Sequence, residues 1–162
     1  MSVEVKQDPD LVEVRLLGFP LALQAASEEH HEELLREFAH VAHTADDGSG
    51  RVPERLLSLV ADLRERYAPF TGPVRDEMEA ARMQGRASVD LVYRVPASVG
   101  ASAQQLADLL EEADEFCRRG DLLTLATGAQ MVIFRRWVLE EFGRQVEGAE
   151  PQPWAASRGS MA

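Results

Sequence analysis

Residues 88–96 read SVDLVYRVP, and this stretch decides the fold class. Apolar and polar side chains alternate along it, which is the pattern of a half-buried β-strand. The residues on its apolar face are Val89, Leu91, Tyr93 and Val95. A second segment with this alternation is LVEVRLL, residues 11–17. We expect the two strands to pair with each other, and because a lone pair is marginal in water, helices must cover it.

Outside these strands, apolar residues recur at helical spacing and predict about five helices. They span roughly residues 27–43, 53–67, 74–84, 102–119 and 129–146. Ser27 is the expected N-cap of the first helix. The segment APFTGP, residues 68–73, should separate the second helix from the third, and Gly85 should end the third. The predicted fold class is α+β, predominantly α-helical, with about five helices packed as a bundle on a two-stranded sheet.

The chain has 162 residues, which fits one domain with a real core. We expect a single helix-rich globular domain over residues 1–148. Residues 149–162 read AEPQPWAASRGSMA and are rich in proline and small residues. They predict a flexible C-terminal tail, in which Trp154 is the residue that could dock or contact a partner.

The chain is strongly acidic, with 17 basic and 28 acidic side chains and a formal charge of −11. Such a surface repels phosphate backbones and anionic lipid, so we expect no direct nucleic-acid or membrane binding and a partner with a basic surface. The single cysteine, Cys117, has no partner for an internal disulfide. The first ten residues are polar and predict no signal peptide. These features favour a cytoplasmic location.

All four histidines lie in SEEHHEELLREFAHVAH, residues 27–43. On a helix, His30, Glu33, Glu37 and His40 form one stripe at spacings of three and four. The Glu37-x-x-His40 spacing occurs in ferritin-like di-metal sites, which need a second such helix. No other predicted helix contains a histidine. We therefore favour a solvated helix face over a metal site, and expect His31, on the apolar arc, to be partly buried and hydrogen-bonded.

Other candidate residues also have a structural interpretation beside a functional one. Arg135 and Arg136 could contact an anionic ligand or a partner, but pairing with Glu140 or with acids elsewhere is favoured. Cys117 lies on an apolar stripe and is expected to be a core residue. The Asp46-x-Gly48-x-Gly50 turn resembles that of the GHKL ATPases, but the chain has no asparagine to bind Mg²⁺, so a flexible loop is favoured.

No recognisable catalytic motif is present. The chain lacks a Gly-rich phosphate loop, a Gly-x-Ser-x-Gly elbow, a zinc-ligand cysteine pair and a His-Glu-x-x-His motif. We therefore expect a non-enzyme, with no catalytic residue and no cofactor.

The C-terminal part, EFCRRGDLLTLATGAQMVIFRRWVLEEFGRQVEGAEPQPW (residues 115–154), resembles a group of small actinobacterial proteins. Their pattern looks like CRxGxLLTLATP…FRRWYLxEFxRQ…PxPW. Earlier stretches are also similar: VRLLGFPLAL, ELLREFAHVA, LLSLVADLRERY and VDLVYRVP. The group resembles proteins encoded beside partner-switching stress regulators, which include anti-sigma kinases, STAS-domain antagonists and phosphatases. One departure is Gly128-Ala129, where the pattern often has a proline.

The resemblance implies regulation and carries no catalytic residue over. We expect a non-catalytic cytoplasmic module for protein interaction or sensing in bacterial signal transduction, with another regulatory protein as partner. The alternative is a small-molecule or metal-binding protein that uses the His30, Glu33, Glu37 and His40 stripe. A degenerate relative of the anti-sigma kinases is the third hypothesis. A homodimer stays open, since a wide apolar arc on the last helix could be buried against a second copy.

Overall fold

The computed structural model describes residues 11–44, 51–120 and 127–154. In chain order the elements are β1 (Leu11–Pro20), α1 (Leu21–Thr44), α2 (Arg51–Met83), β2 (Ser88–Pro96), α3 (Val99–Arg119) and α4 (Ala129–Val146). This confirms an α+β fold that is mostly helical. The described part of the chain contains four helices, so the expectation of five was wrong by one.

β1 and β2 pair with each other, as predicted, and the structure shows that the pairing is antiparallel. Val14 lies opposite Tyr93 and Leu16 lies opposite Leu91, and all four side chains are buried. The sheet therefore has one apolar face, because side chains on opposed strand positions point to the same side. α4 contacts β1 and α2 contacts β2, so both helices contribute to covering the sheet.

β1 does not end at Leu17 as expected but continues through a bulge to Pro20. The register shifts between Leu16 and Phe19, and Gly18 has a φ of 65°, which glycine adopts without steric penalty. The Gly18 N–H donates to Asp90 Oδ1 of β2 at 2.8 Å. A side chain of one strand thus holds the backbone of the other where regular pairing is interrupted.

α1 begins at Leu21, directly after the strand, so Ser27 is not its N-cap. Tertiary packing overrides the local signal, because Leu21 is buried in the core and its N–H donates to the carbonyl of Ala87 at 3.1 Å. Ser27 lies inside the helix and is buried.

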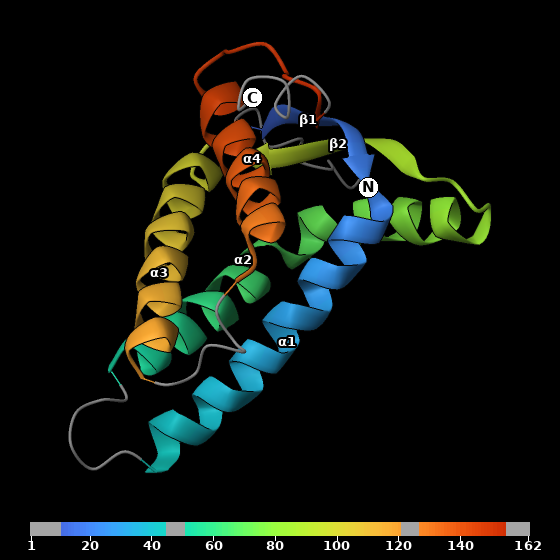
Figure 1. The fold of residues 1–162 in the computed structure, drawn as a ribbon. Helices are drawn as coiled ribbons and strands as arrows, with labels where there is room; N and C mark the ends of the chain where they lie inside the picture. The colour runs from blue at the N-terminus through green and yellow to red at the C-terminus, as the bar shows by residue number, and fades with distance from the viewer. Residues whose placement is uncertain (1–10, 45–50, 121–126, 155–162) are drawn as a thin grey trace, which may run out of the picture.

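α2 is one continuous helix through Pro69 and Pro73, although these residues were expected to divide it. Each proline removes one backbone hydrogen bond. Apolar packing on both sides compensates, since Leu56 and Val74 are buried in different clusters. The two halves of α2 run in different directions (Figure 1), which we attribute to the prolines. Gly85, with a φ of 71°, ends the helix as predicted.

Two hydrophobic clusters form the core. The first lies under the sheet and joins both strands to the second half of α2 and to α4; its largest side chains include Phe19, Tyr93, Phe134, Trp137 and Trp154. The second lies between α1, the first half of α2 and α3, and contains Leu34, Phe38, Leu56, Leu109, Leu110, Ala113 and Cys117. In Figure 1 the sheet lies near one end of α1 and α3.

Residues 149–154 belong to the packed structure and not to a flexible tail. Gly148, with a φ of 95°, turns the chain after α4. Trp154 is 8 % exposed and packs edge-on against Phe134 and Trp137, at centroid distances of 5.7 and 5.4 Å. The Trp137 indole N–H also donates to the carbonyl of Gln152 at 2.8 Å. Residues 155–162 lie outside the described part of the chain.

Among the described helices, none combines the length and the apolar character that crossing a bilayer requires.

Candidate functional site

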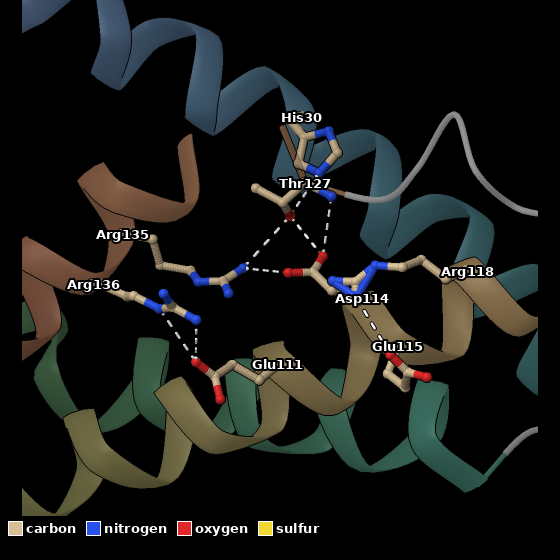
Figure 2. Close-up of polar contacts among 8 residues, drawn as sticks. All are labelled: His30, Glu111, Asp114, Glu115, Arg118, Thr127, Arg135 and Arg136. Carbon is tan, nitrogen blue, oxygen red and sulfur yellow. Dashed lines mark hydrogen bonds and ion pairs between the residues drawn. The ribbon is translucent and has the colours of Figure 1, made fainter. Parts of the chain in front are cut away.

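Arg135 and Arg136 are neighbours on α4 but reach different acids of α3 (Figure 2). Arg135 is 6 % exposed, and its Nη1 donates to Asp114 Oδ2 at 3.0 Å. Arg136 lies at the surface, with its Nη2 2.9 Å from Glu111 Oε1. One buried and one exposed ion pair therefore tie α4 to α3. The favoured structural pairing is found, with acids of another helix in place of Glu140.

Asp114, which is 2 % exposed, holds a small polar junction. Its Oδ1 accepts from the N–H of Thr127 at 3.1 Å and from the Thr127 hydroxyl at 2.7 Å. That hydroxyl has one proton, so it accepts the hydrogen bond from His30 Nε2, which lies 3.2 Å away. The junction therefore joins α1, α3 and the residues that precede α4. Both carboxylate oxygens of Asp114 have hydrogen-bond partners within it.

His31 is half-buried beside this junction. Its pKa is lowered from 6.5 to about 4, first by burial and then by the nearby His30 and Arg135, while Asp114 acts in the opposite direction. The imidazole is therefore neutral at pH 7. Partial burial agrees with the sequence prediction, but within the described residues its ring has no hydrogen-bond partner.

The proposed metal stripe does not converge on a common point. His30 turns toward Thr127, whereas Glu33, Glu37 and His40 are exposed on α1. Across residues 11–44, 51–120 and 127–154, no group of three or more His, Cys, Asp or Glu side chains is placed to hold a metal ion. The stripe therefore receives no support as a metal site from this fold.

A groove of about 690 Å³ runs between the first half of α3 and the second half of α4. The small and aliphatic residues of its lining, which we call the floor, are Ala97, Gly100, Ala101, Ala103, Ala107, Leu139, Gly143 and Val146. At Gly100 the helices approach closely, because a Cβ there would lie 3.4 Å from Val146 Cγ1. At Gly143 an added Cβ would meet nothing within 4 Å, so the groove is open at that point.

The rim of the groove is predominantly acidic. It carries the carboxylates of Asp108, Glu111, Glu140 and Glu147 and the guanidinium groups of Arg136 and Arg144. Both guanidinium groups already pair with carboxylates, Arg136 with Glu111 and Arg144 with the buried Glu141. The rim therefore presents an excess of negative charge around an apolar floor.

The remaining sequence candidates are placed as follows. Trp154 is packed into the first hydrophobic cluster and is not presented to a partner. Cys117 is fully buried, and burial, together with Asp114, raises the pKa of its thiol to about 11, so it is a protonated core residue at neutral pH. The Asp46-x-Gly48-x-Gly50 turn lies outside the described residues.

The sequence analysis missed the groove, although a signal was present. Gly100, Ala103 and Ala107 follow one another at spacings of three and four, which places small residues on one face of α3. Such a face can hold a neighbouring helix closely or leave space beside it. Only the position of α4 determines which of these occurs along each part of the helix.

A scan against protein-family models, a search of curated proteins and a search of solved structures each found no match to this chain.

Proposed function

We propose that this chain is a non-catalytic, cytoplasmic protein-interaction module of bacterial signal transduction. Its partner is another regulatory protein, which lays a basic amphipathic helix into the groove between α3 and α4. The observation that supports this most is the combination of an apolar floor of small residues with an acidic rim.

Helix-in-groove recognition needs a trough whose floor lets the apolar face of the guest helix approach closely. Alanine and glycine residues line the α3 side of the floor, so the guest backbone can come near. Leu139 and Val146 supply aliphatic surface on the α4 side. The groove thus offers apolar contact area, with room for a further carbon atom at Gly143.

The rim selects the charge of the guest. Asp108, Glu140 and Glu147 border the floor, and the whole chain has a formal charge of −11. Lysine and arginine residues flanking the apolar face of a guest helix would meet these carboxylates, which favours encounter and correct orientation. The resemblance to proteins encoded beside partner-switching regulators supports the same class of partner.

The polar residues that could suggest chemistry are already engaged with each other, which supports binding over catalysis. Asp114 is saturated by Arg135 and Thr127, and Thr127 in turn accepts from His30. The Cys117 thiol is buried and protonated. No observation favours the alternative metal or small-molecule function over the groove.

A glycine-to-leucine pair tests the groove. Gly143→Leu adds an apolar side chain to the lining of the groove, and its Cβ meets no atom within 4 Å. Gly72→Leu is the matched control, since Gly72 is also helical with nothing within 4 Å of an added Cβ, but does not line the groove. Both substitutions replace a helical glycine. Because Gly72 precedes Pro73, the circular dichroism of each variant is first shown to match that of the wild type.

The probe is a labelled synthetic helix with leucines at i, i+3, i+4 and i+7 and lysines elsewhere, measured by fluorescence anisotropy. We expect binding by the wild type and by Gly72→Leu, and a loss of about tenfold or more in Gly143→Leu. A peptide with glutamates in place of the lysines should bind much more weakly. Equal binding of both peptides, or unchanged binding by Gly143→Leu, would overturn the groove as the docking site.

The same variants identify the natural partner in a source lysate. A regulatory protein retained by the wild type and by Gly72→Leu, but lost by Gly143→Leu, supports the proposed function. Recovery of no such protein, together with tight binding of a metabolite in native mass spectrometry, would contradict it.

A further inference from the structure

The outer edge of β2 carries backbone groups that point away from the sheet. Arg15 of β1 directs its N–H and C=O toward Gln145 of α4, so they face away from β2. Val92 is the register partner of Arg15. In an antiparallel sheet, two residues that face each other without exchanging backbone hydrogen bonds form a non-hydrogen-bonded pair. The N–H and C=O groups of each residue in such a pair point away from the other strand, toward the outer edge of their own strand. The N–H and C=O of Val92 therefore face outward, and so do those of Asp90 and Arg94, two residues away on each side.

The two edges of the sheet differ in how they are covered. The β1 edge is closed at Arg15 by the Gln145 amide. Within the described part of the chain, no hydrogen bond from another element reaches the backbone of Asp90, Val92 or Arg94. An edge strand with unpaired backbone groups is a template for a further strand.

The side chains along this edge have a self-complementary order. Asp90 and Arg94 are exposed and carry opposite charges at equal distances from Val92. Val92 is one of the large apolar residues exposed in the described part of the chain, at 43 %. If a second copy of β2 is related to the first by a twofold axis through Val92, Asp90 of each copy lies opposite Arg94 of the other copy.

We propose that two copies of this chain pair through the outer edges of β2, antiparallel and centred on Val92, so that the two sheets become one of four strands. Asp90 of each copy then lies opposite Arg94 of the second copy, and the two Val92 side chains meet on the twofold axis. The outward N–H and C=O groups at these positions bond each other in the same register. A twofold interface of this kind is closed, so it yields a dimer and not a fibre.

The register is specified by the residues themselves. A shift of two residues would place Asp90 opposite Val92 and would lose both charge pairs. A parallel arrangement in register would place like charges together, which is unfavourable across a strand pair. Pro96 ends the ladder, because it has no N–H to donate. Pairing of strand edges alone buries a small area, so the dimer should be reversible and depend on concentration.

Analytical ultracentrifugation of the full chain over a range of concentrations tests the proposal. We expect the wild type to shift from the mass of one 17.9 kDa chain toward twice that mass as its concentration rises. Val92→Pro removes the outward N–H but no bond to β1, and Arg94→Asp places two aspartates opposite each other. Both variants should remain monomeric. Arg66→Asp, which alters an exposed arginine of α2, is the charge-matched control and should dimerise normally.

A mixture of two variants distinguishes strand pairing from loss of folding. Asp90→Arg alone and Arg94→Asp alone should each be monomeric, because like charges face each other. Mixed together, they restore both opposite-charge pairs and should form a heterodimer. Asp90→Arg also removes the acceptor of the Gly18 N–H, so the circular dichroism of each component is first shown to match that of the wild type. A wild type that stays monomeric at its highest soluble concentration would overturn the proposal, as would dimers that persist in Val92→Pro and Arg94→Asp. Gly143→Leu should dimerise normally, so this outcome is independent of the groove.

Discussion

The side-chain amide of Gln145 pairs with the backbone of Arg15 as a neighbouring strand would. Gln145 Oε1 accepts from the Arg15 N–H at 2.8 Å, and Gln145 Nε2 donates to the Arg15 carbonyl at 2.8 Å. The same Nε2 donates to Glu141 Oε2 at 2.7 Å, and that oxygen also accepts from the backbone N–H of Gln152 at 3.1 Å. One buried pair of side chains on α4 therefore connects the sheet edge to the segment that carries Trp154.

Gln145→Leu should lower the free energy of unfolding by about 2 kcal/mol. The substitution leaves both backbone groups of Arg15 unpaired and removes a donor from Glu141, which is 2 % exposed. Urea denaturation followed by circular dichroism measures the change. Gln104→Leu removes an exposed amide that donates to Asp108, and it should change stability by less than about 0.5 kcal/mol. Equal effects of the two substitutions would contradict the role given to Gln145.

Trp154→Ala should destabilise the protein by about 3–5 kcal/mol, because it opens a cavity against Phe134 and Trp137. The near-ultraviolet circular dichroism of Trp137 should weaken at the same time. Gln152→Ala keeps the backbone carbonyl that Trp137 binds and serves as a control with little expected effect. A Trp154→Ala protein as stable as the wild type would show that residues 149–154 are a dispensable tail after all.

Asp114→Leu should cost about 3–5 kcal/mol, since it leaves the Arg135 guanidinium buried without its partner. Adding Arg135→Met to that variant should recover much of the loss, because two apolar side chains then replace the ion pair. Glu111→Leu breaks the exposed pair with Arg136 and should cost about 1 kcal/mol or less. A double-mutant cycle from thermal unfolding gives the coupling, and purely additive effects of Asp114→Leu and Arg135→Met would refute the pairing.

The pH dependence of stability should contain a contribution from His31. Its folded pKa, about 4, lies below the ordinary 6.5, so the unfolded chain binds this proton first as the pH falls. The stability that neutral His31 provides is therefore complete above about pH 6.5 and is lost progressively toward pH 4, by about 3 kcal/mol at most.

His31→Leu should remove this contribution, so the difference in stability between the variant and the wild type should change between about pH 6.5 and pH 4 and stay constant above. Carboxylates also titrate over this pH range, but both proteins contain the same ones. Their contributions therefore cancel when the stability of the wild type is subtracted from that of the variant. If the stability difference between His31→Leu and the wild type does not change with pH, the pKa of His31 is the same in the folded and unfolded states.

Local sequence patterns predicted the parts of the fold that depend on local chemistry. The alternation in residues 88–96 predicted a strand whose buried face is made by Val89, Leu91, Tyr93 and Val95. Gly85 predicted a helix end because few other residues adopt its positive φ. In each case a side chain or a backbone angle within a few residues is enough to decide the structure.

The predictions that failed were those in which a distant contact outweighed a local preference. Ser27 has the chemistry of an N-cap, but the burial of Leu21 begins α1 six residues earlier. Pro69 and Pro73 predicted a break, but apolar packing on both sides keeps α2 continuous. Proline and small residues predicted a tail in which Trp154 could dock, and in residues 149–154 the aromatic cluster of Phe134 and Trp137 holds Trp154 and its segment.

The sequence by itself determined the strand pair, the mostly helical class and the acidic surface, because periodicity and charge are properties of the residues alone. Only the tertiary structure decided which polar residues are buried and where a surface is hollow. Arg135 and Arg136 are adjacent in sequence, yet one lies in the core beside Asp114 and the other at the rim of the groove. Their surroundings come from α3, and the position of one helix against another is set by the packing of many side chains far apart in the chain.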